Sequence, residues 1–312
     1  MSSRRPASSR RKEQLAATTR EKVVAVLAFV AIMGGVYGVW WYLQRMPVRQ
    51  FPSDIDIEIP SYLLSVPSGV IHFRFVNFTQ LRTKTVGVEQ LENGTLISLA
   101  TPKLNLTTND ADWIEDIEVE EGVMASVLGM SPGSAAHLAG ILTNATVARE
   151  LLAGVITYRV RNATGGWGKL AIVGNLVVYS DQTSDPTSPV EKILTAITTG
   201  ESRLFDNESV KESFYVATQG GPLFGLSYTH FYPSGQSEVD IEWMFSVVRY
   251  AGELIEEKNM FKLPSQQDAI NEFDALKPYY FVKGQNPYII GPLIVVQYDY
   301  SLEDLKTVVL SL

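Results

Sequence analysis

The sequence predicts a mixed α and β (α+β) extracytoplasmic domain carried on a single N-terminal transmembrane helix. Three features indicate this: an uncharged apolar run over residues 23–43, later segments in which apolar and polar residues alternate, and segments of helical composition between them. The chain has no cysteine, so disulfides cannot stabilise it. Its roughly 260 residues beyond the apolar run are enough to bury a core without them.

The apolar run has the length of a membrane span. As a helix, residues 23–43 would extend about 31 Å, which matches the hydrocarbon core of a bilayer. The run ends in Trp40, Trp41 and Tyr42, residues that favour the membrane–water interface. A cleaved signal peptide is usually shorter and ends in small residues. A retained anchor is therefore the interpretation, with a cleaved signal or a buried core helix as the alternatives.

The charges on either side of this run predict its orientation. Residues 1–22 carry a net +5, which predicts a disordered basic tail in the cytosol. Because the whole chain carries −8, the remainder carries −13, a balance that argues against nucleic-acid binding. The predicted organisation is a tail (1–22), a transmembrane helix (23–43), a juxtamembrane segment (44–52) and a lumenal or extracellular domain (53–312).

Glycosylation motifs give independent support for this topology. Six of the eleven asparagines start an Asn-x-Ser/Thr sequon, and all six follow the predicted anchor. The predicted glycosylation sites are Asn77, Asn93, Asn105, Asn144, Asn162 and Asn207. Such a pattern suits the lumen of the endoplasmic reticulum or the outside of an archaeal cell.

Several segments are predicted to be strands. "DIDIEIPSYLL" from Asp54 alternates isoleucines with acids, and "GVIHFRFVNFT" from Gly69 places Phe73 and Phe75 opposite His72 and Arg74. The other strand-like segments are "GVITYRVRNAT" from residue 154, with Arg159 and Arg161 on its polar side, "KLAIVGNLVVYSD" from residue 169, as a pair or one long strand, and "PYIIGPLIVVQYDY" from residue 287.

Four segments are predicted to be helices. "EEGVMASVLGM" from Glu120, "PGSAAHLAGIL" from Pro132 and "SPVEKILTAITTG" from Ser188 have helical composition or a capping serine. The clearest pattern begins at Ser237, "SEVDIEWMFSVVRYAGELIEE". Its apolar stripe runs through Ile241, Phe245, Val248, Gly252 and Ile255.

No pattern predicts a catalytic, cofactor-binding or metal-binding residue. His72, His137 and His230 lie far apart without metal-ligand spacing. The acidic residues of segment 110–121 could bind a cation such as Ca²⁺, although a solvated acidic loop is the simpler interpretation. "ATGGWGKL" lacks the spacing of a phosphate loop and predicts a hairpin turn instead.

Two stretches resemble the S subunit of the GPI-anchor transamidase. The first is "VWWYLQRMPVRQFP" followed by "DIDIEIPSYLL", which is similar to that family's membrane helix, juxtamembrane stretch and first strand. The second is "LSYTHFYPSGQSEVDIEWMFSVVRYAGELI" from Leu226, where a strand, a turn and a helix are expected. The matching residues there are Pro233, Gly235, Asp240, Glu242, Trp243 and Tyr250. Family members are longer and end in a second membrane helix, so the resemblance implies a divergent member lacking it.

The resemblance implies a non-catalytic, scaffold-type subunit of a membrane complex that attaches glycolipid anchors to lumenal proteins. Its partners would be the membrane and other membrane subunits. Gly34, Gly35 and Gly38 would form the packing face of the membrane helix, because small residues let helices approach closely. The alternative is a stand-alone membrane-anchored surface glycoprotein, such as an archaeal envelope or filament component. A lumenal hydrolase is the third class considered, and the missing catalytic patterns disfavour it.

Overall fold

The computed structural model describes residues 48–49, 57–83, 94–181, 189–219, 222–231, 240–280, 287–305 and 308. The chain divides into two compact units, Met1–Pro47 and Val48–Leu312. The first unit lies outside the described residues, and with it the predicted tail, membrane helix and packing glycines Gly34, Gly35 and Gly38. Within the described ranges, no helix combines the length and apolar character needed to cross a membrane.

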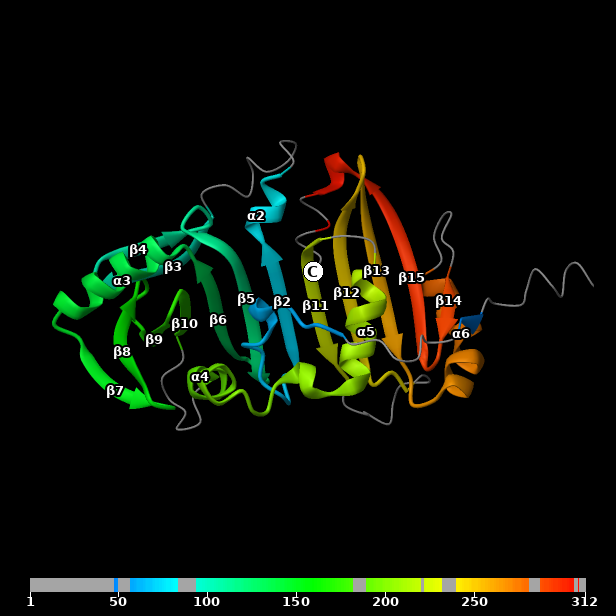
Figure 1. Ribbon diagram of the computed structural model, residues 1–312, viewed down its shortest axis with the longest axis horizontal. Helices are drawn as coiled ribbons and strands as arrows, with labels where there is room; N and C mark the ends of the chain where they lie inside the picture. Colours follow the sequence, from blue (N-terminus) through cyan, green and yellow to red (C-terminus); the bar gives the residue numbers. More distant parts are fainter. Residues whose placement is uncertain are drawn as a thin grey trace, which may run out of the picture. The chain divides into compact units, whose positions relative to one another are not determined.

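The second unit is built on one sheet of 15 strands (Figure 1). The strands are β1 (Val48–Arg49), β2 (His72–Asn77), β3 (Thr95–Thr101), β4 (Leu104–Thr107), β5 (Ala111–Glu120), β6 (Val123–Met130), β7 (Ala148–Leu152), β8 (Val155–Asn162), β9 (Trp167–Val173), β10 (Leu176–Ser180), β11 (Leu223–His230), β12 (Trp243–Ala251), β13 (Leu254–Lys262), β14 (Tyr288–Ile290) and β15 (Leu293–Ser301). Their spatial order is β1-β14-β15-β13-β12-β11-β2-β5-β6-β10-β9-β8-β3-β4, with β7 paired to β8. Only β1 with β14 is a parallel pair among these described strands.

The helices are fewer and lie between strands in the chain. They are α2 (Phe78–Leu81), α3 (Pro132–Asn144), α4 (Pro189–Thr199), α5 (Glu208–Thr218) and α6 (Gln266–Tyr280), with short 3-10 turns η1 (Ser61–Leu63), η3 (Leu204–Asp206) and η4 (Leu302–Asp304). The predicted mixed α+β class is therefore wrong. The described fold is a large antiparallel sheet with a few helices against it.

Both faces of the sheet carry a hydrophobic core. This explains why the sequence analysis mistook buried strands for helices. One cluster contains residues of α4 and α5, such as Ile193 and Phe214, and the other contains residues of α2 and α3, such as Phe78 and Leu138. The adjacent β6 residues Val127 and Leu128 belong to different clusters. Because neighbouring residues on a strand point to opposite faces, a strand that is covered on both faces, such as β6 or β12, has consecutive apolar residues and little period-two alternation.

The segment from Ser237 shows how this burial pattern resembles a helix. Instead of one helix, residues from Trp243 onward form the hairpin β12–β13. Phe245 and Val248 are both fully buried, but they pack in different clusters on opposite faces. The helical interpretation placed these two residues on one stripe because they are three positions apart. In the structure they lie on the two faces of one strand. Gly252 makes the turn, with a φ of +66° that suits the first position of a two-residue hairpin loop.

Two further predictions from short segments are wrong. "EEGVMASVLGM" is not a helix, because Gly122 turns the chain and β6 follows. The predicted strand from Asp54 is not formed in its described part, where residues 57–60 have no regular structure and η1 follows Pro60. Proline lacks the N–H that a strand ladder uses, which is consistent with that break.

Other elements agree with the sequence patterns. β2 and β8 occupy the predicted segments, as do α3 and α4. Residues 169–181 belong to a strand pair, β9 and β10, joined by a turn at Gly174 whose φ is +62°. The late segment from Pro287 forms two strands, β14 and β15, where one was predicted.

Candidate functional site

A basic and aromatic surface lies on the hairpin formed by β8 and β9. We call it the Trp167 surface, and it consists of Arg159 and Arg161 on β8 with Trp167 and Lys169 on β9. Arg161 pairs directly with Trp167, and Arg159 pairs with Lys169. The Cζ atoms of both arginines lie 4.6 Å from the centroid of the indole ring. Such distances are within the range of a cation–π interaction.

The local sequence explains why this surface forms. The turn between β8 and β9 has Gly165 at a φ of +88°, and the amide of Gly166 donates to the side-chain oxygen of Asn162 over 2.7 Å. Gly168 separates Trp167 from Lys169 on the strand. A β-carbon there would lie 2.7 Å from the backbone oxygen of Ser180 on β10, which is closer than a side chain allows. Glycine therefore lets β9 and the end of β10 approach.

The charges on the Trp167 surface are unbalanced. The Nζ atom of Lys169 forms an ion pair with Glu150 Oε1 of β7 at 2.9 Å. Arg159 and Arg161 are exposed, and neither forms an ion pair with another described residue. Three cations and one anion thus gather on a protein whose net charge is −8. This arrangement can bind an anionic group.

The neighbouring hairpin of β7 and β8 exposes apolar side chains. Leu151 and Ile156 stand directly opposite each other across the two strands and are 68% and 52% exposed. Ile156 projects from the same face of β8 as Tyr158 and Val160, which belong to the α2/α3 core. The apolar row on this face of the sheet therefore continues past the core to an exposed hairpin.

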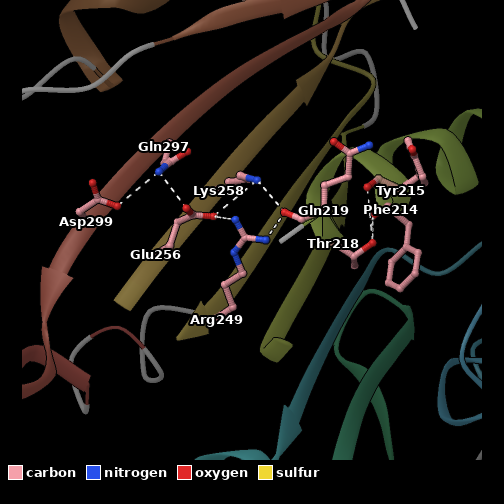
Figure 2. A network of polar contacts seen from close by, with 9 residues as sticks. All are labelled: Phe214, Tyr215, Thr218, Gln219, Arg249, Glu256, Lys258, Gln297 and Asp299. Carbon is pink, nitrogen blue, oxygen red and sulfur yellow. Dashed lines mark hydrogen bonds and ion pairs between the residues drawn. The ribbon is translucent and has the colours of Figure 1, made fainter. Parts of the chain in front are cut away.

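A buried polar network fastens α5 to the sheet (Figure 2). Arg249 on β12 lies directly opposite Glu256 on β13, and the two form an ion pair whose side chains are about nine-tenths buried. Lys258 Nζ lies 3.5 Å from Glu256 Oε1, and Gln297 Nε2 donates to Glu256 Oε2 over 2.9 Å. The Glu256 carboxylate thus has partners on three strands.

The same two cations hold the end of α5. Arg249 and Lys258 both donate to the backbone oxygen of Gln219, which caps this helix. The C-terminus of a helix carries partial negative charge, so two cations there are favourable. The network can be followed in Figure 2, and its role is to position α5 on the sheet.

A buried acid lies on the α4/α5 face. Glu115 of β5 is fully buried, between Phe75 of β2 and Val127 of β6. Tyr62 of η1 stacks on Phe75 with 4.8 Å between ring centroids. Ser65 donates from Oγ to Glu115 Oε2, while Oε1 has no hydrogen-bond partner among the described residues.

Burial dominates the electrostatics of this acid. Removal from water raises the pKa of Glu115 from 4.5 to about 8, the nearby Asp116 charge also raises it, and the hydrogen bond from Ser65 opposes the shift. Burial likewise raises the pKa of Tyr62, with a further contribution from Glu115. Glu115 was predicted within a solvated acidic loop. The structure instead places residues 111–120 in β5, where Glu115 faces the α4/α5 core and Asp116, on the opposite face, forms an ion pair with Arg74.

A small cleft lies beside α4. It encloses about 440 Å³ and has mixed charge. Its lining residues are Pro67, Ser68, Glu191, Lys192, Thr195, Glu201 and Ser202. Ser202 has a φ of +57°, a conformation that only a few per cent of non-glycine residues adopt. The Nζ atom of Lys192 forms an ion pair with Glu120 Oε1 at 2.6 Å. This lysine therefore does not supply the cleft with an unpaired cation.

The predicted sites are dispersed over the described part of the chain. His72 on β2 and His230 at the end of β11 lie on paired strands, but His72 is opposite Thr229 and so faces the other side of the sheet from His230. His137 lies on α3, and the described residues contain no group of three or more potential metal ligands. Asn93 lies outside the described residues. Among the other sequons, the exposed asparagines are Asn105, Asn144 and Asn207, and the half-buried ones are Asn77 and Asn162.

Sequence reasoning missed the Trp167 surface. It placed Arg159 and Arg161 on the polar side of a strand and predicted a hairpin turn before Lys169, and both predictions agree with the structure. It gave Trp167 no role. The feature that could have revealed this surface is the register of the β8–β9 hairpin. A short turn after Asn162 places Trp167 opposite Arg161.

Comparisons with known proteins identify no family. No protein-family model matches the sequence, and no curated protein matches it. Solved structures that resemble the fold include crystal form III of TP0453, with a TM-score of 0.43 and 9% identity over 84% of this chain and 100% of that one. Crystal form I of TP0453 gives a TM-score of 0.41 and 9% identity over 83% of this chain and 98% of that one. Similarity at this level assigns no function.

Proposed function

We propose that this chain is a non-catalytic, scaffold-type subunit of a membrane complex. The observation that carries the proposal is the exposed hairpin of β7 and β8. Leu151 and Ile156 lie side by side at the end of an apolar row and remain exposed. Burial of apolar area by a partner is favourable by about 25 cal/mol per Å², so this hairpin is suited to a protein contact.

The more specific form of the proposal rests on the sequence. The resemblance of residues 39–64 to the S subunit of the GPI-anchor transamidase supports a complex that attaches glycolipid anchors to lumenal proteins. The second stretch of resemblance supports it less, because the helix expected after Pro233 and Gly235 is replaced by β12 and β13. The uncharged run 23–43 is the proposed membrane attachment, and the sequons support a lumenal position for the domain.

One observation favours a second candidate, a stand-alone surface glycoprotein. Asn105, Asn144 and Asn207 are exposed on three separate elements, the strand β4, the end of α3 and the cap of α5. Glycans at these positions would cover distant parts of the domain and leave less surface for a partner. A scaffold and a glycan-covered surface protein therefore differ in whether the β7–β8 hairpin is occupied.

Co-purification from the native membrane tests the scaffold function. We expect the full-length protein, extracted in mild detergent, to retain membrane subunits at a fixed ratio. The double variant Leu151→Glu and Ile156→Glu should reduce their recovery by on the order of tenfold, because it places charge in a buried contact.

Leu254→Glu is the matched control. Leu254 is 46% exposed at the start of β13, so the same substitution there changes hydrophobicity and charge away from the hairpin. A wild-type protein that migrates alone as a monomer would refute the scaffold function and support the glycoprotein. Equal loss of partners in the control would show that the hairpin is not the contact.

A second experiment addresses the proposed membrane helix. Replacing Gly35 and Gly38 by leucine should weaken association with other membrane subunits, because larger side chains keep helices apart. Protease resistance of the domain serves as the folding control. Unchanged recovery of partners would remove the membrane helix from the proposed contacts.

A further inference from the structure

The Trp167 surface has two cations that no described residue neutralises. Arg159 and Arg161 are exposed and lie two residues apart on β8, so their side chains project from the same face. Lys169, the third cation, already has Glu150 as its partner. The two guanidinium groups therefore keep donors available for an external anion.

Contact with Trp167 fixes these guanidinium groups in place. Both Cζ atoms lie 4.6 Å from the indole centroid, so the ring restricts the rotamers of both arginines. Ordering a free arginine on binding costs side-chain conformational entropy. Pre-positioned arginines avoid part of that cost, and the planar guanidinium can bind a carboxylate through two hydrogen bonds.

The spacing of the arginines indicates the shape of the ligand. Alternate residues of a strand lie about 7 Å apart, and carboxylates at alternate positions of an extended peptide have the same spacing. The Glu150–Lys169 pair already shows a carboxylate of the neighbouring strand β7 bound on this surface.

We propose that the Trp167 surface binds an extended acidic segment of a partner protein through Arg159 and Arg161. Charge complementarity selects this partner, because the surface is locally basic on a chain with a net charge of −8. A protein segment supplies carboxylates at a fixed spacing, which a fluid anionic lipid surface does not. The inference rests on the proposed scaffold function and specifies one class of partner segment.

Peptide binding to the full-length protein in mild detergent tests the proposal. The probe is a fluorescent peptide in which glutamate alternates with threonine, and its control contains the same residues with the glutamates contiguous. We expect the alternating peptide to bind more tightly at low salt. Arg159→Gln together with Arg161→Gln should weaken it by roughly tenfold or more.

Two further variants separate geometry from net charge. Arg159→Lys with Arg161→Lys retains the charge but loses the forked geometry, so we expect an intermediate loss of affinity. Arg149→Gln is the matched control, because Arg149 is exposed on β7 but packs over the ring of Tyr158. It should leave the affinity of the peptide unchanged.

Several outcomes would overturn the proposal. Equal affinity for the alternating and the contiguous peptide would refute the spacing argument. If Arg149→Gln weakened peptide binding as much as the Arg159 and Arg161 variant does, the effect would be one of net charge alone. Arginine-dependent binding to vesicles of equimolar phosphatidylcholine and phosphatidylserine, without peptide binding, would assign the surface to lipid. If the peptide fails to bind while the Leu151 and Ile156 variant still releases partners, this inference fails and the scaffold function stands.

Discussion

Replacing Glu115 with glutamine should make the protein more stable, and the gain should increase with pH. Burial raises the pKa of the folded-state carboxyl from 4.5 to about 8. Between these values the folded state holds a proton that the unfolded state has released. The wild-type free energy of unfolding therefore falls by about 1.4 kcal/mol for each pH unit between these values. Above about pH 8 both states have released the proton, so Glu115 causes no further change.

The size of the effect follows from the width of that window. A shift from 4.5 to about 8 corresponds to a loss on the order of 5 kcal/mol by pH 8, of which about 3 kcal/mol is lost by pH 7. Glutamine has nearly the same shape and does not titrate. We therefore expect Glu115→Gln to match wild type near pH 4 and to exceed it by several kcal/mol at pH 8.

Urea unfolding of the full-length protein in mild detergent, followed by tryptophan fluorescence, measures this difference. Glu121→Gln is the matched control, because Glu121 is exposed in the turn before β6. Parallel pH dependence of wild type and Glu115→Gln would refute the reasoning. It would mean that the folded state solvates or neutralises the charged carboxylate in some other way.

Three other predictions concern the α5 network, the β8–β9 hairpin and the sequons. Arg249→Met should lower the free energy of unfolding by about 3–5 kcal/mol, because it leaves Glu256 buried without its main partner, and adding Glu256→Gln should recover part of this loss in urea unfolding. Gly168→Ala should cost about 1–3 kcal/mol in the same assay, since its β-carbon would meet the Ser180 backbone oxygen. At least three of the six sequons should carry glycan, and a bare-polypeptide mass for protein from its native membrane would contradict this.

The sequence predicted strands well where polar residues occupy most of one face. In β2 the aromatic residues Phe73 and Phe75 are buried while His72 and Arg74 are half-exposed, so period-two alternation is visible. In β12 both faces are buried, and periodicity cannot separate such a strand from a buried helix. The remaining signal was the Gly252 turn, which the helical interpretation treated as part of its stripe.

A capping pattern agrees with the structure at α3 but not in the segment from Ser237. α3 begins after Ser131, whose hydroxyl accepts from the Ser134 amide, and Pro132 occupies its first position. These local features act over one turn and do not depend on what covers the helix. The segment from Ser237 has a similar serine at its start. Its residues from Trp243 onward nevertheless form β12, because they pair with β11 and β13, and this pairing is a non-local effect.

The Trp167 surface illustrates the part of the site that a sequence can and cannot specify. A strand ending in Arg159 and Arg161 and a glycine turn after Asn162 could both be recognised, and together they limit the register of the hairpin. A slip of one residue would send Trp167 to the opposite face and separate it from both guanidinium groups. The counter-charges are different, because Glu150 reaches Lys169 from β7, a strand that the sequence analysis did not assign. Which cation is neutralised, and therefore which two remain for a partner, depends on that third strand and could be learned only from the folded sheet.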